Sequence, residues 1–118
     1  MNIRKRRVED EIRRILAEIL IRDLPCNQHG LITVTRVECS NDLKIARIFL
    51  SVYHTDAQER QAGVHRIIEN RSRIRGLLGN RLQLRFVPEL IFVEDDTMVR
   101  VEKIERLIQS LHESESAE

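Results

Sequence analysis

The sequence has few residues of the type that cross-links small proteins. Only two of its 118 residues are cysteines, Cys26 and Cys39. They lack both the C-x-x-C spacing of metal and redox sites and the density of a disulfide scaffold. A chain of this length can bury a core without such links. We therefore expect a single-domain protein in the reducing cytoplasm, with inert thiols.

Aromatic residues are also scarce, and there is no tryptophan. The only four aromatic residues are Phe49, Tyr53, Phe86 and Phe92. All but Tyr53 fall inside expected strands, where packing in the core is the default. A surface that stacks bases on exposed aromatic rings is therefore not expected. Any RNA recognition should depend on backbone charge and shape.

Long apolar runs and catalytic motifs are missing as well. Even the longest apolar runs are short, such as Ile48–Leu50, so no membrane span is expected. The start of the chain is basic and lacks an apolar segment, so no signal peptide is expected either. The four histidines are scattered without ligand spacing, and there is no P-loop, G-x-S-x-G or H-E-x-x-H motif. We expect no enzyme activity, metal, cofactor, small-molecule substrate or membrane partner.

The charge is unevenly distributed, although the net charge is only +1. Residues 1–85 hold 17 Lys and Arg against 10 Asp and Glu, whereas residues 86–118 hold 3 against 9. Five arginines and no acid lie between Asn70 and Pro88. Charged runs are usually solvated faces, but guanidinium groups suit bidentate contact with phosphate.

Apolar periodicity and turn residues predict the order of elements. Six apolar residues from Val8 to Leu20 recur at helical spacing, and Pro25 with residues 27–30 ends that helix. The other expected elements are strands 31–39 and 44–52 in a hairpin, a helical region 57–78, a strand from Leu82 towards Glu94 that Pro88 places at an edge or bulge, and a helix from Asp96-Thr97. The fold class is therefore α+β.

The middle helical region is expected to kink. On a helical wheel, the apolar residues before position 70 and those after position 72 define faces roughly 80° out of phase. A break at Asn70-Arg71-Ser72 resolves this conflict, since Asn and Ser side chains compete for helical hydrogen bonds.

The motif Gly76-Leu77-Leu78-Gly79 matches the G-x-x-G loop with which KH domains clamp the RNA backbone. A clamp needs exposed middle residues, but Leu77 and Leu78 are in phase with Ile74 and are expected to be buried. We therefore interpret Gly79 as the C-terminal cap of the second half-helix and not as part of a clamp.

The element order resembles a single type II KH-like domain, and the resemblance extends to residues. Ser40-Asn41-Asp42-Leu43 fits an S-x-D-L turn, and residues 74–90 fit I-R-x-x-L-G-x-x-L-x-L-R-x-x-P-E-L. With Arg7-Val8 and Asp96-Thr97, the pattern is similar to the ribosome-binding factor A family over about residues 4–112. That family has an A-x-G kink, where this chain has Asn70-Arg71-Ser72, and usually Asp-Pro-Arg, where this chain has residues 24–26.

The resemblance implies a monomeric, non-enzymatic, cytoplasmic factor that binds the free or immature small ribosomal subunit and its rRNA. It further implies help in late maturation and in processing of the rRNA 5′ end, and a role in cold adaptation. The expected domain is 1–112, followed by an acidic flexible tail, 113–118. The expected RNA contacts are Arg71, Arg73 and Arg75 at the kink, Arg81 and Arg85 on the way into the strand, and a flexible basic arm of Arg4, Lys5, Arg6 and Arg7.

One alternative remains from a different class. The last helix places Val101, Ile104, Leu107, Ile108 and Leu111 on one face. This face could serve a protein–protein interaction module, with the arginines merely solvated. An enzyme acting on RNA ends is disfavoured, because no acid–base or metal constellation is visible.

Overall fold

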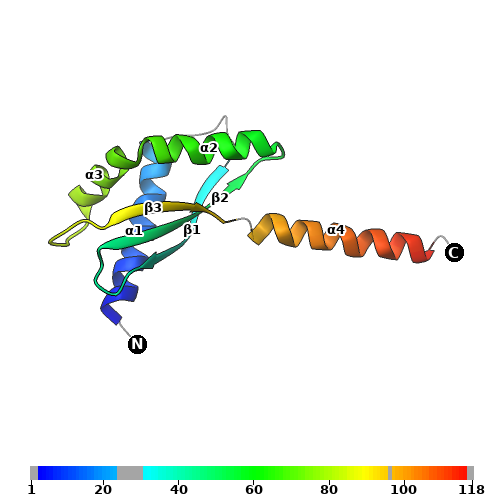
Figure 1. Cartoon of the computed structure of the whole chain (residues 1–118), viewed down its shortest axis with the longest axis horizontal. Helices are drawn as coiled ribbons and strands as arrows, with labels where there is room; N and C mark the ends of the chain where they lie inside the picture. The colour runs from blue at the N-terminus through cyan, green and yellow to red at the C-terminus, as the bar shows by residue number, and fades with distance from the viewer. Residues whose placement is uncertain (1–2, 24–30, 96, 117–118) are drawn as a thin grey trace.

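A computed structural model of the chain describes residues 3–23, 31–95 and 97–116. The elements in chain order are α1 (Ile3–Arg22), β1 (Leu31–Cys39), β2 (Ile45–Tyr53), α2 (Ala57–Glu69), α3 (Arg71–Arg81), β3 (Glu89–Glu94) and α4 (Thr97–Ser116). Figure 1 shows a body built from the first six elements and a long helix α4 that projects from it. This order confirms the α+β prediction. The residues expected to end the first helix, 25 and 27–30, lie outside the described ranges.

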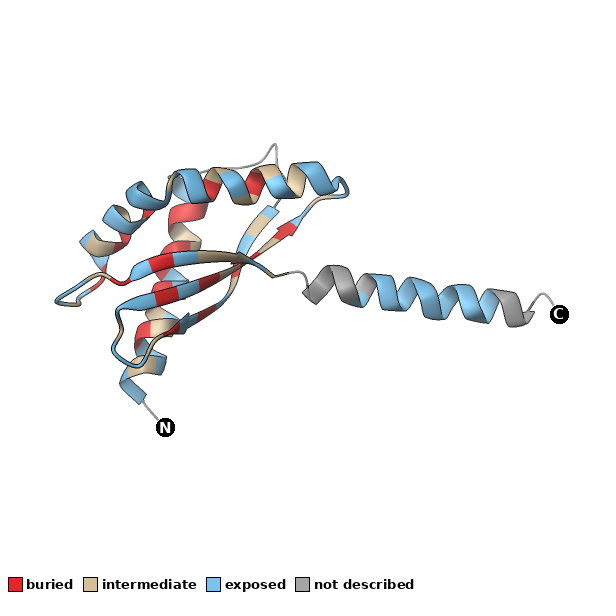
Figure 2. Cartoon of the chain, in the orientation of Figure 1, coloured by how far each residue is buried: buried red, intermediate tan, exposed pale blue. Residues whose placement is uncertain are grey.

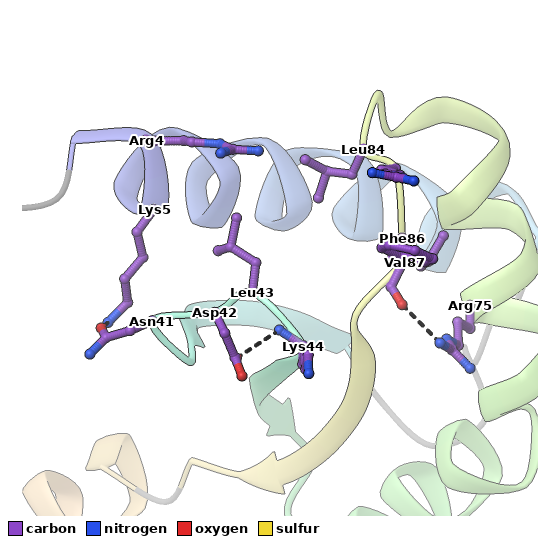
Figure 3. A pocket seen from close by; sticks show the side chains of 11 residues that line it. Arg4, Lys5, Asn41, Asp42, Leu43, Lys44, Arg75, Leu84, Phe86 and Val87 are labelled. Atoms are coloured by element: carbon purple, nitrogen blue, oxygen red, sulfur yellow. Dashed lines mark hydrogen bonds between the residues drawn. The ribbon is translucent and has the colours of Figure 1, made fainter.

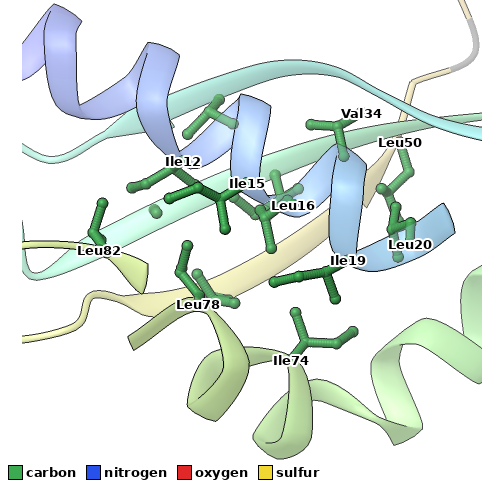
Figure 4. Packing of buried hydrophobic residues seen from close by; sticks show 14 of the residues in the cluster. Ile12, Ile15, Leu16, Ile19, Leu20, Val34, Leu50, Ile74, Leu78 and Leu82 are labelled. Carbon is green, nitrogen blue, oxygen red and sulfur yellow. The ribbon is translucent and has the colours of Figure 1, made fainter. Parts of the chain in front are cut away.

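Helix α1 forms because its apolar residues recur every three or four positions, which gives it one apolar stripe. The six residues predicted for that stripe are all buried: Val8, Ile12, Ile15, Leu16, Ile19 and Leu20. Figure 4 shows five of them, from Ile12 to Leu20, packed against side chains from the sheet and from α3, such as Leu50 and Ile74. This packing makes α1 the centre of the core.

The sheet has the strand order β1-β2-β3, with β1 antiparallel and β3 parallel to the central strand β2. Side chains alternate along β2, so Ala46, Ile48, Leu50 and Val52 are buried while the residues between them are not. Since α1 packs on β1 and α2 packs on β2 and β3, the helices cover one face of the sheet. The opposite face carries half-exposed residues such as Phe49, over which the Arg36 guanidinium lies 4.1 Å from the ring centroid.

The helical region breaks at Asn70, as predicted. The Asn70 side-chain amide donates to the Arg66 carbonyl oxygen at 2.8 Å, alongside the Asn70 backbone N–H at 3.2 Å. Asn70 has φ −95° and ψ 13°, outside the helical range, and ends α2. Ile67 in α2 and Ile74 in α3 are both completely buried, so the break turns both apolar faces towards the core.

The end of α3 and the start of β3 differ from the prediction. The third strand begins at Glu89 and not at Leu82, so residues 82–88 form a connection between α3 and β3. Pro88 lacks an N–H for the sheet, and the first ladder bond of this strand is Glu89 N–H to the Lys44 carbonyl oxygen at 2.8 Å. Gly79 is not a helix cap either, because α3 continues to Arg81.

Helix α4 does not cover the sheet. It extends away from the body and gives the molecule a long axis of 66 Å (Figure 1). The apolar side chains that the sequence placed on one face, from Val101 to Leu111, are exposed (Figure 2). The helix continues to Ser116, farther than expected, and the division into residues 1–112 and 113–118 stays a prediction.

Candidate nucleic-acid interface

The hairpin turn between β1 and β2 is fixed by its own side chains. The Ser40 hydroxyl donates to the Asp42 carboxylate at 2.7 Å and accepts from the Ile45 N–H, while the Lys44 N–H donates to Asp42 at 3.1 Å. The two bonds that Asp42 accepts hold the pKa of its carboxyl group below its usual range, and the bond from Ser40 has the larger effect. Leu43 adopts φ 59°, a conformation uncommon for a branched side chain, and packs against the core. The S-x-D-L sequence therefore fixes the conformation of the turn through its own side chains.

Beside this turn lies a hollow of about 730 Å³ (Figure 3). Its walls come from four parts of the chain: the first turn of α1, the hairpin turn, Arg75 of α3, and the connection 82–88. Five cationic side chains line it, Arg4, Lys5, Lys44, Arg75 and Arg85, and Asp42 is the one acid among its lining residues. Since Asp42 is already bonded within the turn, the hollow is strongly cationic.

Arg75 holds the connection in place. Its guanidinium donates to the Val87 carbonyl oxygen at 2.8 Å (Figure 3). It also donates to the Pro88 carbonyl oxygen at 3.2 Å. Gly79 permits the same approach from the next turn of α3, because a Cβ there would lie 2.8 Å from Cγ2 of Val87. The connection is therefore held against α3 by the hydrogen bonds of Arg75. It can lie this close because Gly79 has no side chain to displace Val87.

Phe86 was expected in a strand and packed in the core, and this prediction is wrong, because the residue is 75% exposed. The Arg85 guanidinium carbon lies 5.5 Å from the centroid of the ring. Phe86 lines the cationic hollow and also a shallower hollow along α3. Ser72, Gly76, Gly79 and Asn80 line the second hollow on the helix side. The connection thus carries an exposed aromatic ring between two concave surfaces.

The four basic residues at positions 4–7 do not form a flexible arm, because all four belong to α1. Arg4 and Lys5 line the cationic hollow, and Lys5 donates to the Asn41 side-chain oxygen at 3.3 Å. Arg6 and Arg7 are exposed on the same helix, outside the lining of the hollow. They lie at the end of α1 where the helix dipole is positive, and the first turn contains no acid.

The five arginines of residues 71–85 do not form one patch. Arg81 pairs with Glu18 of α1, and this hydrogen bond holds the pKa of Glu18 below its usual range. Arg75 is bonded to the connection, and Arg85 is exposed in that connection and not in a strand. Arg71 and Arg73 are exposed in the first turn of α3, roughly 160° apart on the helical wheel.

The G-x-x-G motif forms no clamp loop, since Gly76 and Gly79 both lie inside α3. Leu78 is completely buried and Leu77 is half-buried, as expected from their phase. A Cβ at Gly76 would meet nothing within 4 Å. The two glycines instead leave the helix surface low where the shallower hollow runs over it.

Sequence reasoning missed two members of the site. Lys44 lines the hollow because it directly follows the hairpin turn, which its own hydrogen bonds hold in place. Phe86 was expected in a strand, and the signal that could have placed it was Pro88, since a strand that begins after this proline leaves residues 82–87 in a connection.

Three further observations concern the Cys39 thiol, metal binding and membrane spans. Burial raises the pKa of the Cys39 thiol to about 11, so this thiol is neutral near pH 7. Within residues 3–23, 31–95 and 97–116, no group of three or more His, Cys, Asp or Glu could hold a metal ion. The helices in these ranges are also too short or too polar to cross a membrane.

The fold and the site together define the class. A three-stranded sheet, with helices on one face and a broken helix pair leading into a parallel strand, is a KH-like domain, and a cationic hollow lies beside its hairpin turn. The family model described as "Ribosome-binding factor A" matches residues 4–108. The chain belongs to the ribosome-binding factor A family.

Individual relatives agree with this assignment. Ribosome-binding factor A of Lactobacillus delbrueckii subsp. bulgaricus is 36% identical over 115 residues, which cover 98% of this chain and 96% of the relative. A solution NMR structure of a candidate ribosome binding factor A from Thermotoga maritima is 32% identical, with a TM-score of 0.67, and covers 82% of this chain and 93% of its own. A Thermus thermophilus homology model, fitted into a cryo-EM map of a 30S–RbfA complex, has a TM-score of 0.65 at 21% identity and covers 75% of this chain and 92% of its own.

Proposed function

We propose that this chain is a non-enzymatic cytoplasmic assembly factor that binds the free or immature small ribosomal subunit through its rRNA. It acts as a monomer late in assembly, assists processing of the rRNA 5′ end, and supports growth in the cold. The observation that carries the RNA contact is the cationic hollow, where five basic side chains face one locally bonded acid. Membership of the family and the 30S complex of the Thermus thermophilus relative support the choice of the small subunit.

The nine predicted RNA contacts divide into two roles in this proposal. Arg4, Lys5 and Arg85 at the hollow contact phosphates, joined by Lys44. Arg6 and Arg7 at the start of α1, and Arg71 and Arg73 at the kink, extend the surface on either side. Arg75 and Arg81 act mainly by holding the connection and α1 in place, because their guanidinium groups are already bonded within the fold.

A salt titration tests the phosphate contacts. Purified small subunits are titrated with the protein at several salt concentrations, and the slope of log affinity against log salt is compared between variants. Each lost phosphate contact should reduce the slope by about 0.7 on single-stranded RNA. The double variant Lys44→Ala and Arg85→Ala should therefore lower the slope by about 1.4. The same slope in wild type and variant would refute the phosphate contact at the hollow.

A matched control and a specificity test complete the experiment. Arg36 and Arg47 lie on the open face of the sheet, away from the hollow, and their double alanine variant should leave the slope unchanged. Co-sedimentation should show binding to free small subunits in preference to whole ribosomes. Equal binding to both particles would contradict the proposed role in assembly.

A second candidate function rests on α4, whose apolar face is unusually exposed. Leu107 and Leu111 are 65% and 66% exposed, and Ile104 is 56% exposed. A protein partner with an apolar groove could bury this face. Replacing Leu107 and Leu111 by glutamate should then weaken binding to small subunits and leave the salt slope of the remaining binding unchanged. Unchanged affinity in this variant would exclude the protein–protein module.

A further inference from the structure

Exposed Phe86 is not accounted for by phosphate binding. Its ring is 75% exposed, although neighbours in the same connection are held in place. Leu84 packs against the core, and Val87 is fixed by Arg75 and by its close approach to Gly79. The backbone on both sides of Phe86 is therefore anchored. An aromatic ring on an anchored backbone is presented to solvent without the entropic cost of ordering a loose loop.

The surroundings of the ring are those of a nucleotide site. Phe86 stands at the edge of a hollow of about 730 Å³, within the range of about 300–1,000 Å³ for small-molecule pockets. Lys44 and Arg4 line the same hollow, and the Arg85 guanidinium lies over the ring. A flat apolar surface beside convergent cations matches a base beside its phosphates, because bases stack on aromatic faces while the backbone carries the charge.

The second hollow extends this surface along α3. It runs from Ser72, next to the kink, over Gly76 and Gly79 to the other side of Phe86. The two glycines present no side chain there, so an extended strand could approach the helix backbone closely. Phe86 therefore separates two places where a chain of nucleotides could lie, which suits a ring that stacks one base as the strand passes.

We propose that Phe86 stacks one unpaired base of single-stranded RNA, with the cations of the hollow on the phosphates beside that base. The base lies on the ring face that Arg85 does not cover, so that guanidinium, ring and base form one stack. This inference rests on the proposed function, since it assigns a base-contacting residue to the same RNA surface. It also replaces the expectation that recognition uses charge and shape alone.

A single tryptophan provides a direct test. The chain has no tryptophan, so Phe86→Trp introduces the only one, at an exposed position where a larger ring is accommodated. Its fluorescence is recorded while oligouridylate of eight nucleotides is added, and again with an abasic oligonucleotide of the same length and charge. Stacking predicts strong quenching by the first oligonucleotide and little by the second. Equal signals from the two would overturn the proposal.

Tyr53 offers a matched control, because it is 76% exposed but lies at the end of β2 and lines neither hollow. Tyr53→Trp should give no quenching that depends on the bases, and such quenching there would show non-specific stacking and count against the proposal. Uridine monophosphate is tested at the same nucleotide concentration. Quenching by the mononucleotide that matches the oligonucleotide would indicate a free-nucleotide site and overturn the assignment to RNA.

Affinity measurements separate this inference from the proposed function. Phe86→Ala should weaken binding of the base-bearing oligonucleotide by about 5- to 150-fold, without changing the salt slope, because stacking on an aromatic side chain is neutral. If Phe86→Ala binds like wild type while Lys44→Ala and Arg85→Ala reduce the slope, the base site is wrong and the phosphate surface stands. If neither change has an effect, both are wrong.

Discussion

Gly79 provides a sharp test of how the connection 82–88 is held, because Gly76 in the same helix is its natural control. Replacing a helical glycine by alanine stabilises a helix by about 1 kcal/mol, since glycine loses more backbone entropy on folding. At Gly76 the new methyl group meets nothing within 4 Å, so the full gain should appear. For a domain of this size, the melting temperature should rise by about 4 °C.

At Gly79 the same methyl group would lie 2.8 Å from Cγ2 of Val87. Valine is short and stiff about χ1, and Arg75 bonds the Val87 carbonyl oxygen, so neither side chain nor backbone yields easily. Such overpacking costs about 1–3 kcal/mol. The free energy of unfolding of Gly79→Ala should therefore fall below that of Gly76→Ala by about 1–3 kcal/mol.

Urea denaturation followed by circular dichroism measures these differences, and a double variant identifies their cause. In a Val87→Ala background the clash is gone, so Gly79→Ala should now stabilise by about 1 kcal/mol, as at Gly76. If Gly79→Ala is as stable as Gly76→Ala in the wild-type background, the connection does not lie against α3 as described. The anchoring of Phe86 would then lose one of its supports.

Other predictions concern the site and the core. Arg75→Ala should destabilise the fold by about 1–3 kcal/mol through two lost hydrogen bonds to carbonyl groups, whereas Arg71→Ala should leave urea stability unchanged within about 0.5 kcal/mol. Since the pKa of Asp42 is lowered in the fold, its bonds stabilise the hairpin above pH 3.8 and are lost as pH falls through the lowered value. Ser40→Ala should raise this pKa in a carboxyl NMR titration, and an unchanged pKa would contradict the hydrogen bonding described for the turn. Cys39, with a pKa of about 11, should stay unreactive towards a thiol reagent at pH 8 until the chain is denatured, in a variant that lacks the other cysteine.

The sequence predicted the fold well where a pattern repeats along one element. The apolar stripe of α1 and the alternation of β2 each contain enough repeats to define a face, and the structure buries both as expected. The break at Asn70 was also predictable, because two apolar faces out of phase cannot belong to one straight helix. The boundary of β3 was missed, since residues 82–88 have strand-like composition and are held out of the sheet by contacts with α3, and Pro88 was the one sequence signal against a strand there.

The site was predicted less completely, for a related reason. The arginines were identified by their closeness in sequence, but the fold assigns them to different surfaces. Arg81 turns towards Glu18, Arg75 turns towards the connection, and Arg85 joins Arg4, which is distant in sequence. Charge density along the chain indicates a basic region. Only the tertiary arrangement decides which charges converge and which are used within the fold.

Helix α4 gives this small chain an unusual reach. Its 20 residues span about 30 Å, a large part of the 66 Å length of the molecule. Glu94 ends β3 and Thr97 begins α4, so the helix starts three positions after the last residue of the sheet. A rotation of about 20° at the start of the helix would move its far end by about 10 Å. A small change in the direction of α4 therefore produces a large displacement of its exposed apolar side chains near Leu111.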